Sequence, residues 1–212
     1  MDFKDGLETV WQLSFESLQP DCIALLSAFT FCAPDSIPQS LFEFDDQEEN
    51  MTDEMLWYLD CERYVTFYPI TRPYNCTICC NRWLISSISL HTATEELLAL
   101  ALIKRDRYER VFSIHRLIAT QFRRFLSPEA RQRAFFEASI LMYNVFPKRP
   151  KKAGAARANL YNVWDTCQLW LQHVLQLKSS FMQERKRNPG FAACRETCET
   201  WVQCQRSVQY FI

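Results

Sequence analysis

The sequence predicts a mainly α-helical protein with one short β-hairpin, and three observations lead to this fold class. Apolar residues recur three and four positions apart in several segments, which is the spacing of an amphipathic helix. Helix-starting residues stand before these segments, as at Pro20 and at Ser127 with Pro128. Two short strand-like pieces flank residues 106–109, and this pattern favours a hairpin.

Taken in order, the helical patterns are separated by breakers such as 33–38 and the turn signal 188–190. Thr94 is the expected N-cap of the helix before the hairpin. Residues 64–92 mix prolines, cysteines and β-prone residues without a clear period, so they form an irregular insert. The expected helices cover residues 9–18, a segment from residue 20, then 39–42, 51–59, 94–103, about 114–125, 127–146, 160–177 and 191–210.

The chain is organised around residues 110–126, which read RVFSIHRLIATQFRRFL. Strand-like residues come first, and then a helix about twelve residues long is expected. Arg116, Arg123 and Arg124 fall off its apolar stripe, so we expect them to face solvent or a partner. The residues of the stripe are Ile114, Leu117, Ile118, Gln121, Phe122 and Phe125.

Composition excludes several classes of function. The chain has only three glycines, far apart, whereas a phosphate-binding loop of the Walker or dinucleotide type needs closely spaced ones. Neither a nucleophile with a neighbouring base nor a pair of carboxylates in a catalytic context is visible. We therefore predict no enzymatic activity and no cofactor.

The sequence shows no signal peptide and no apolar run long enough to span a membrane. The ten cysteines are expected to be reduced thiols in a cytoplasmic protein. A nuclear location is the alternative, because residues 148–152 fit a short import signal, although a solvated basic linker explains them as well. The basic residues of this segment are Lys148, Arg149, Lys151 and Lys152.

Charge is divided unevenly along the chain. Residues 1–62 contain fifteen acidic residues and one lysine, whereas residues 104–157 contain fourteen basic residues and four acidic ones. These parts carry net charges of −14 and +10. Such asymmetry favours attraction between the two parts, or contact of each with an oppositely charged partner, although two solvated faces remain an equal alternative.

One cysteine cluster has part of the spacing of a zinc site. Cys76, Cys79 and Cys80 form the C-x-x-C pattern, and His91 follows at a distance that zinc coordination permits. A second spaced pair is missing, and the later cysteines have the spacing of a helix stripe. Buried or incidental thiols are the favoured interpretation, so no metal is predicted.

Helix, helix, helix, hairpin, helix is the order of a winged-helix unit, and several blocks carry a family resemblance. The segments SLQPDCIALLSAFTFCAPDSIPQSLF, EELLALALIKRD, FSIHRLI and LSPEARQ are similar to the region that follows the nucleotide-binding core in fungal NB-ARC or NACHT receptors of the STAND, NLR-like class. The resemblance implies a winged-helix-like domain followed by antiparallel TPR-like helices, without the nucleotide-binding core.

Three parts are expected on this basis. Residues 1–19 are the tail of a preceding helical element, 20–127 the winged-helix-like domain with its insert at 64–92, and 128–212 a TPR-like segment that ends before its array is complete. Part of the insert is hypothesised to be translated intron, because the family has far less sequence there.

His115 stands where the family has its winged-helix histidine. The resemblance implies contact with the ADP β-phosphate in the resting state. Here Arg116 follows in place of the acid of plant members, and the chain offers no phosphate loop, so the position is expected to be inactive within this chain alone.

The function implied is that of a non-catalytic regulatory fragment of a signalling protein. It would contact a protein partner or a missing N-terminal nucleotide-binding domain. The alternatives are a winged-helix DNA-binding regulator that uses Arg116, Arg123, Arg124 and the linker lysines, and an accessory protein with no autonomous activity. The acidic N-terminal third disfavours DNA as the partner.

Overall fold

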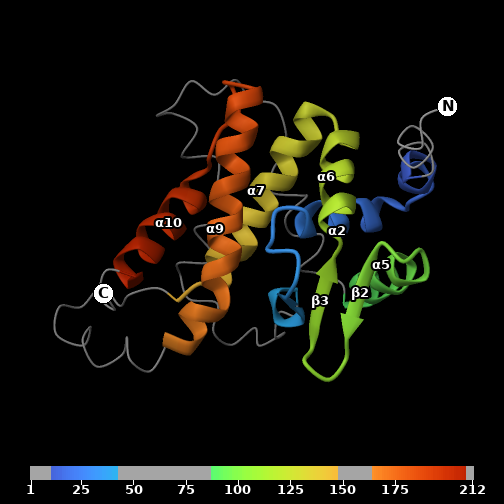
Figure 1. Ribbon diagram of the computed structural model, residues 1–212, viewed down its shortest axis with the longest axis horizontal. Helices are drawn as coiled ribbons and strands as arrows, with labels where there is room; N and C mark the ends of the chain where they lie inside the picture. Colours follow the sequence, from blue (N-terminus) through green and yellow to red (C-terminus); the bar gives the residue numbers. More distant parts are fainter. Residues whose placement is uncertain (1–10, 43–86, 148–163, 209–212) are drawn as a thin grey trace.

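The computed structural model describes residues 11–42, 87–147 and 164–208. It is mainly helical with a small three-stranded antiparallel sheet, which confirms the predicted fold class. In Figure 1, α7, α9 and α10 form one side of the molecule, and the other side holds α2, α5, α6 and the hairpin. The predicted helix at 51–59, the linker at 148–157 and most of the insert lie outside the described residues.

The sheet is built from two segments far apart in the chain. Strands β2 (Ile103–Asp106) and β3 (Val111–Ile114) form the predicted hairpin, and β1 (Ile37–Pro38) pairs with the other edge of β3. Sequence analysis placed only a breaker at β1, because two residues are too few for a period-2 pattern. The order β1-β3-β2 attaches the hairpin to the segment that follows α2 (Pro20–Phe29).

The hairpin turn is closed by an acid rather than by glycine. The Asp106 carboxylate accepts hydrogen bonds from the backbone N–H groups of Tyr108 and Glu109, at 2.8 and 3.0 Å. Arg110 then adopts a positive φ of 54°, which returns the chain into β3. This combination of a side-chain-stabilised turn and one left-handed residue gives a hairpin without glycine.

Helix α5 (Ser87–Ala99) begins earlier than the sequence predicted. Thr94 is buried in its interior, so the expected N-cap there is wrong, and residues 87–92 of the insert are helical. The helix also ends before residue 103, because Ala101 takes a left-handed φ of 54° and Leu102 donates back to the Leu97 carbonyl at 3.0 Å. The β-prone composition of 87–91 was overridden by packing against α2.

Helices α6 (Arg116–Phe125) and α7 (Pro128–Val145) follow the predicted signals closely. His115 is the N-cap of α6, and the Ser127 side chain caps α7 by accepting from Ala130 N at 3.2 Å. The short η1 turn (Gln39–Leu41) also lies where a helical turn was expected. Helix α6 contacts α2, which packs in turn against α5, so the hairpin and α6 rest on a helical core.

The last two helices differ from their predicted bounds. Helix α9 (Trp164–Arg187) continues well past residue 177, up to the turn at 188–190, and α10 (Arg195–Val208) begins four residues later than expected. The sequence predicted an apolar stripe on this helix, formed by Cys194, Cys198, Trp201, Val202 and Val208. This stripe is wrong in part, because Cys198 and Val202 are exposed. The buried side of α10 instead carries Thr197, Thr200 and Cys204, with Trp201 partly buried beside them.

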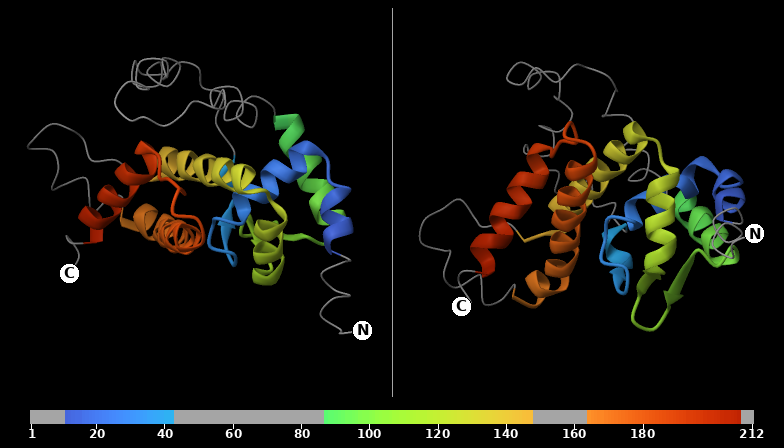
Figure 2. Two further views of the ribbon diagram at one scale, coloured as in Figure 1. Left: turned by 90° about the horizontal axis from the view of Figure 1, so that it is seen from above. Right: turned by 45° about the horizontal axis from the view of Figure 1, so that its top comes forward.

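One hydrophobic core runs through all the described helices and the sheet, and it is continuous across position 127. Figure 2 shows α2 beside α7, and the contact between these two helices joins the two sides of the molecule. Phe15, from the N-terminal helical residues 11–16, packs edge-on against Phe122 with ring centroids 4.9 Å apart. At the centre, Phe135 of α7 lies within 5.6 Å of the rings of Phe31, Phe181 and Phe191.

Replacing Phe135 with alanine tests whether this aromatic cluster joins the two sides. The side chain is fully buried, so Phe135→Ala is expected to lower the free energy of unfolding by about 3–5 kcal/mol. Urea denaturation followed by tryptophan fluorescence measures the change. Tyr108→Ala, at a side chain that is 97% exposed, is the control and should stay within about 0.5 kcal/mol of the parent.

Candidate functional site: the two ends of α6

The N-terminal end of α6 presents the histidine that the sequence singled out. His115 Nδ1 accepts a hydrogen bond from Leu117 N at 3.2 Å, so the imidazole takes the place of the usual serine or aspartate cap. Because Nδ1 is the acceptor, the neutral ring carries its proton on Nε2. The side chain is exposed, and this N–H donor can reach a partner in solution.

The loop at 33–36 supports this end of α6. Ile114 N donates to the Pro34 carbonyl at 2.9 Å, and Arg116 pairs with Asp35 at 2.8 Å. From the opposite direction, Ala33 N donates to His173 Nδ1 of α9 at 3.1 Å. The loop therefore lies between the start of α6 and the middle of α9.

His173 is completely buried, and its environment keeps it neutral. Burial lowers the pKa of its imidazole to about 4, although the Ser36 backbone acts in the opposite direction. Its Nε2 has no hydrogen-bond partner among the described residues, and its ring lies 5.9 Å from that of Trp170. A neutral acceptor at Nδ1 is what the Ala33 N–H group needs, so the contact depends on this protonation state.

The C-terminal end of α6 is joined to α9 directly. Arg123 Nη1 donates to Ser180 Oγ at 3.0 Å, and its guanidinium lies 5.9 Å from the centre of the Phe31 ring. Burial lowers the pKa of Arg123, Glu184 acts in the opposite direction, and the charges of Arg187 and Arg131 lower it further. The arginine is thus held in a partly desolvated place where other positive charges are near.

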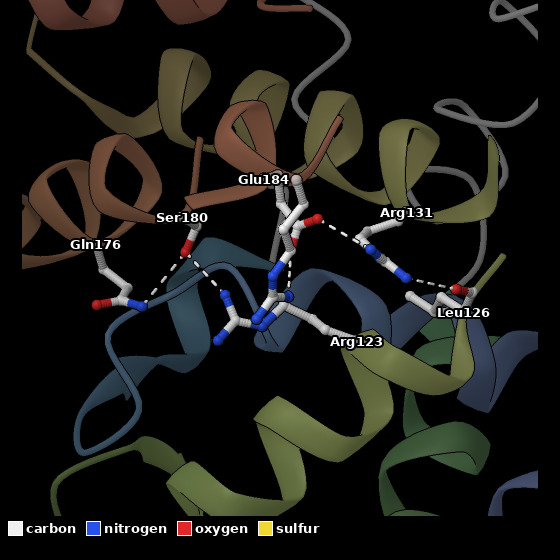
Figure 3. Close-up of polar contacts among 7 residues, drawn as sticks. Arg123, Leu126, Arg131, Gln176, Ser180 and Glu184 are labelled. Carbon is white, nitrogen blue, oxygen red and sulfur yellow. Dashed lines mark hydrogen bonds and ion pairs between the residues drawn. The ribbon is translucent and has the colours of Figure 1, made fainter. Parts of the chain in front are cut away.

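Helix α7 adds an ion pair to the same region (Figure 3). Arg131 Nη1 contacts Glu184 Oε2 of α9 at 2.9 Å, and Nη2 donates to the Leu126 carbonyl at 3.0 Å. The Glu184 side chain is only 3% exposed, and its other oxygen lies 3.4 Å from Arg187. One buried carboxylate on α9 therefore holds the turn between α6 and α7.

The three arginines that were expected to face solvent or a partner differ in what they contact. Arg123 is turned inward onto Ser180, so the prediction that it faces solvent or a partner is wrong for this residue. Arg116 is exposed but paired with Asp35, and Arg124 is exposed. The cause is position: Arg123 lies next to Phe122 at the edge of the buried stripe, and its guanidinium finds an acceptor only after α9 has packed.

Other predictions on α6 and the basic linker have mixed outcomes. Leu117 and Phe125 of the expected apolar stripe are 46% and 36% exposed, whereas Ala119 and Leu126 are buried in their place. The linker residues of the predicted interaction surface lie outside the described residues; they are Lys148, Arg149, Lys151 and Lys152.

The side chains on α7 and α9 that anchor α6 were missed by sequence analysis. His173 carried a usable signal, because it stands between Trp170 and Leu177 at helical spacing and so belongs to the buried stripe. Glu184 and Ser180 carried none, since polar residues near the end of a long helix are usually solvated. These residues acquire their roles only through contact with α6 and α7.

The candidate metal and thiol chemistry finds no support among the described residues. His91 lies exposed on α5, while Cys76, Cys79 and Cys80 lie outside the described ranges, and no cluster of three potential metal ligands occurs within those ranges. Burial raises the pKa of the Cys22, Cys32 and Cys194 thiols to about 12, so these cysteines are protonated at neutral pH.

None of the helices within 11–42, 87–147 and 164–208 combines the length and the apolar character needed to cross a bilayer. No family model matches the chain, and no curated protein or solved structure matches it significantly.

The buried His173 makes stability depend on pH in a defined direction. An unfolded histidine binds a proton near pH 6.5 and folded His173 only near pH 4, so the unfolded chain binds more protons between these values. The contribution of His173 to stability is therefore fully present above about pH 6.5 and is lost as the pH is lowered toward 4. Between pH 7 and 5 the titration of this residue alone should lower the free energy of unfolding by about 2 kcal/mol, which urea denaturation at both pH values measures.

His173→Asn is the matched control, because its amide oxygen can still accept from Ala33 N but does not titrate in this range. The stability difference between parent and variant should shrink as the pH falls from 7 to 5. A difference that stays constant with pH would contradict the buried neutral imidazole.

A further prediction compares a buried and an exposed ion pair of the site. A double-mutant cycle with Arg131→Gln and Glu184→Gln should give a coupling free energy of about 1–3 kcal/mol, because Glu184 is buried and shared. The same cycle with Arg116→Gln and Asp35→Asn should give a coupling within experimental error, since both side chains are exposed. Equal couplings in the two cycles would contradict the assignment of Glu184 as the main anchor.

Proposed function

We propose that this chain is a non-catalytic regulatory segment of a fungal STAND, NLR-like signalling protein. It acts through protein contacts, either with a nucleotide-binding domain or with a separate partner. The winged-helix-like unit would carry His115 to the nucleotide, and the helices that follow would carry the signal from a sensor. The family resemblance of the sequence motivates this proposal, and the anchoring of α6 supports it.

The observation that carries the proposal is the attachment of α6 at both of its ends. At the first end, the loop 33–36 connects Arg116 to His173 of α9 through backbone and side-chain contacts. At the second end, Arg123 contacts Ser180 of the same helix. A displacement of α9 would therefore reach His115 through packed and hydrogen-bonded groups, which is the physical requirement for coupling between two sites.

A regulatory role also agrees with what the site offers chemically. His115 presents one exposed N–H donor at a helix start, a group that suits contact with an anion. The arginines give less support to the DNA-binding alternative, because Arg123 is turned inward and Arg116 is paired with Asp35.

The test begins with the transcripts that contain this coding segment. We expect one of these transcripts to encode, upstream and in frame, a nucleotide-binding domain with a glycine–lysine phosphate loop. The alternative is that such a domain is expressed as a separate protein. ADP release from that domain should be slower in the presence of this chain. The His115→Ala variant should give a release rate about tenfold higher than the parent chain, as expected for the loss of one charge-assisted contact.

Arg124→Ala is the matched control, because Arg124 is exposed on the same helix, nine residues from His115. It should leave the release rate unchanged. Release that is insensitive to His115→Ala would reject the proposed contact, and affinity for duplex DNA that falls steeply with salt would favour the DNA-binding alternative.

A further inference from the structure

The junction of α6, α7 and α9 holds more positive charge than its carboxylate can neutralise. Arg131 and Arg187 both contact Glu184, at 2.9 and 3.4 Å. Arg123 has no carboxylate within ion-pair distance among the described residues, and its hydrogen bond is to the neutral hydroxyl of Ser180. Three guanidinium groups therefore face one buried carboxylate.

Helix dipoles offset part of this excess charge. Helix α6 ends at Phe125 and α9 ends at Arg187, and each C-terminal end contributes about half a negative charge. The N-terminal end of α7 at Pro128 adds about half a positive charge, so an uncompensated charge of about one and a half remains at the junction. A partly buried cation without a full counter-charge is costly, so the site favours the arrival of an anion.

The junction also holds hydrogen-bond donors that the described residues do not use. A guanidinium has five N–H donors, and Arg123 places one of them on Ser180. The Nε group of Arg131 is buried and has no acceptor among the described residues. Arg187 is 53% exposed, so the cluster can be approached from solvent on its side.

We propose that Arg123, Arg131 and Arg187 form a binding site for a phosphoryl group. Phosphate oxygens match the planar fork of a guanidinium and form short charge-assisted hydrogen bonds with it. Glu184 orients two of the arginines and also repels the anion, so it sets the affinity at a moderate level. The site is distinct from His115, because Arg123 lies eight residues further along α6, about 12 Å away.

Binding is tested with inorganic phosphate and the full chain. Calorimetric titration at pH 7.5, with sodium chloride used to keep ionic strength constant, should show saturable binding to one site. Arg123→Gln should weaken the affinity by about tenfold or more, since one charge-assisted contact is lost. Arg124→Gln, which removes the same charge from an exposed neighbouring position, should bind phosphate like the parent.

Two further variants keep the test informative if Arg123→Gln does not fold. Arg187→Gln alters a half-exposed side chain and should also weaken binding. Glu184→Gln should strengthen phosphate binding while it lowers stability, because it removes the competing negative charge. Non-saturable binding, equal affinity in the parent and both arginine variants, or weaker binding by folded Glu184→Gln would overturn the proposal.

The source of the phosphoryl group is resolved by a second titration. A phosphoserine peptide that binds more tightly than inorganic phosphate, while its unphosphorylated form does not bind, would support a protein-borne group. Equal affinity for phosphate and phosphopeptide would support the site with free phosphate as its ligand. His115→Ala should change neither result, so failure of this site and failure of the proposed function can be told apart.

Discussion

The fixing of α6 onto α9 by partly buried polar groups is the constraint on which the position of His115 and of the arginine cluster depends. Helix α6 is only ten residues long, and its own hydrogen bonds would leave it marginal in isolation. Packing of Phe122 and Ala119 holds one face, while Arg123 and the turn before Arg131 are held by side chains of α9. Removing a partner from such a desolvated pair costs more than its formation contributes, so the contact fixes one arrangement.

The aromatic core explains why the polar contacts meet so accurately. Phe135 contacts rings from the α2 side and from α9, so the two sides of the molecule share one packed centre. Dense packing transmits small displacements instead of absorbing them. Ser180 lies directly before Phe181 in the chain, and Phe181 stacks on Phe135 with ring centroids 5.6 Å apart. The packed core therefore fixes the positions of the side chains that make the polar contacts.

This arrangement bears on how a histidine could report the state of distant helices. His115 caps α6 with its own ring. The loop 33–36, which supports the start of this helix, is hydrogen-bonded to His173 of α9. An anion bound by Arg123, Arg131 and Arg187 would change the net charge at the C-terminal end of α6, which is the end opposite to His115. Both ends of α6 would then respond to partners of different chemistry, which is the form that coupling between two sites takes.

The sequence by itself determined the helical class, the hairpin and the Ser127 cap, because these follow from spacing and from local turn chemistry. Tertiary structure decided β1, the early start of α5, and the roles of Arg123, His173 and Glu184. A two-residue strand exists only because β3 offers it an edge. The orientations of Arg123 and Arg131 depend on acceptors that lie 57 and 53 residues away in the chain, and no local pattern encodes such a contact.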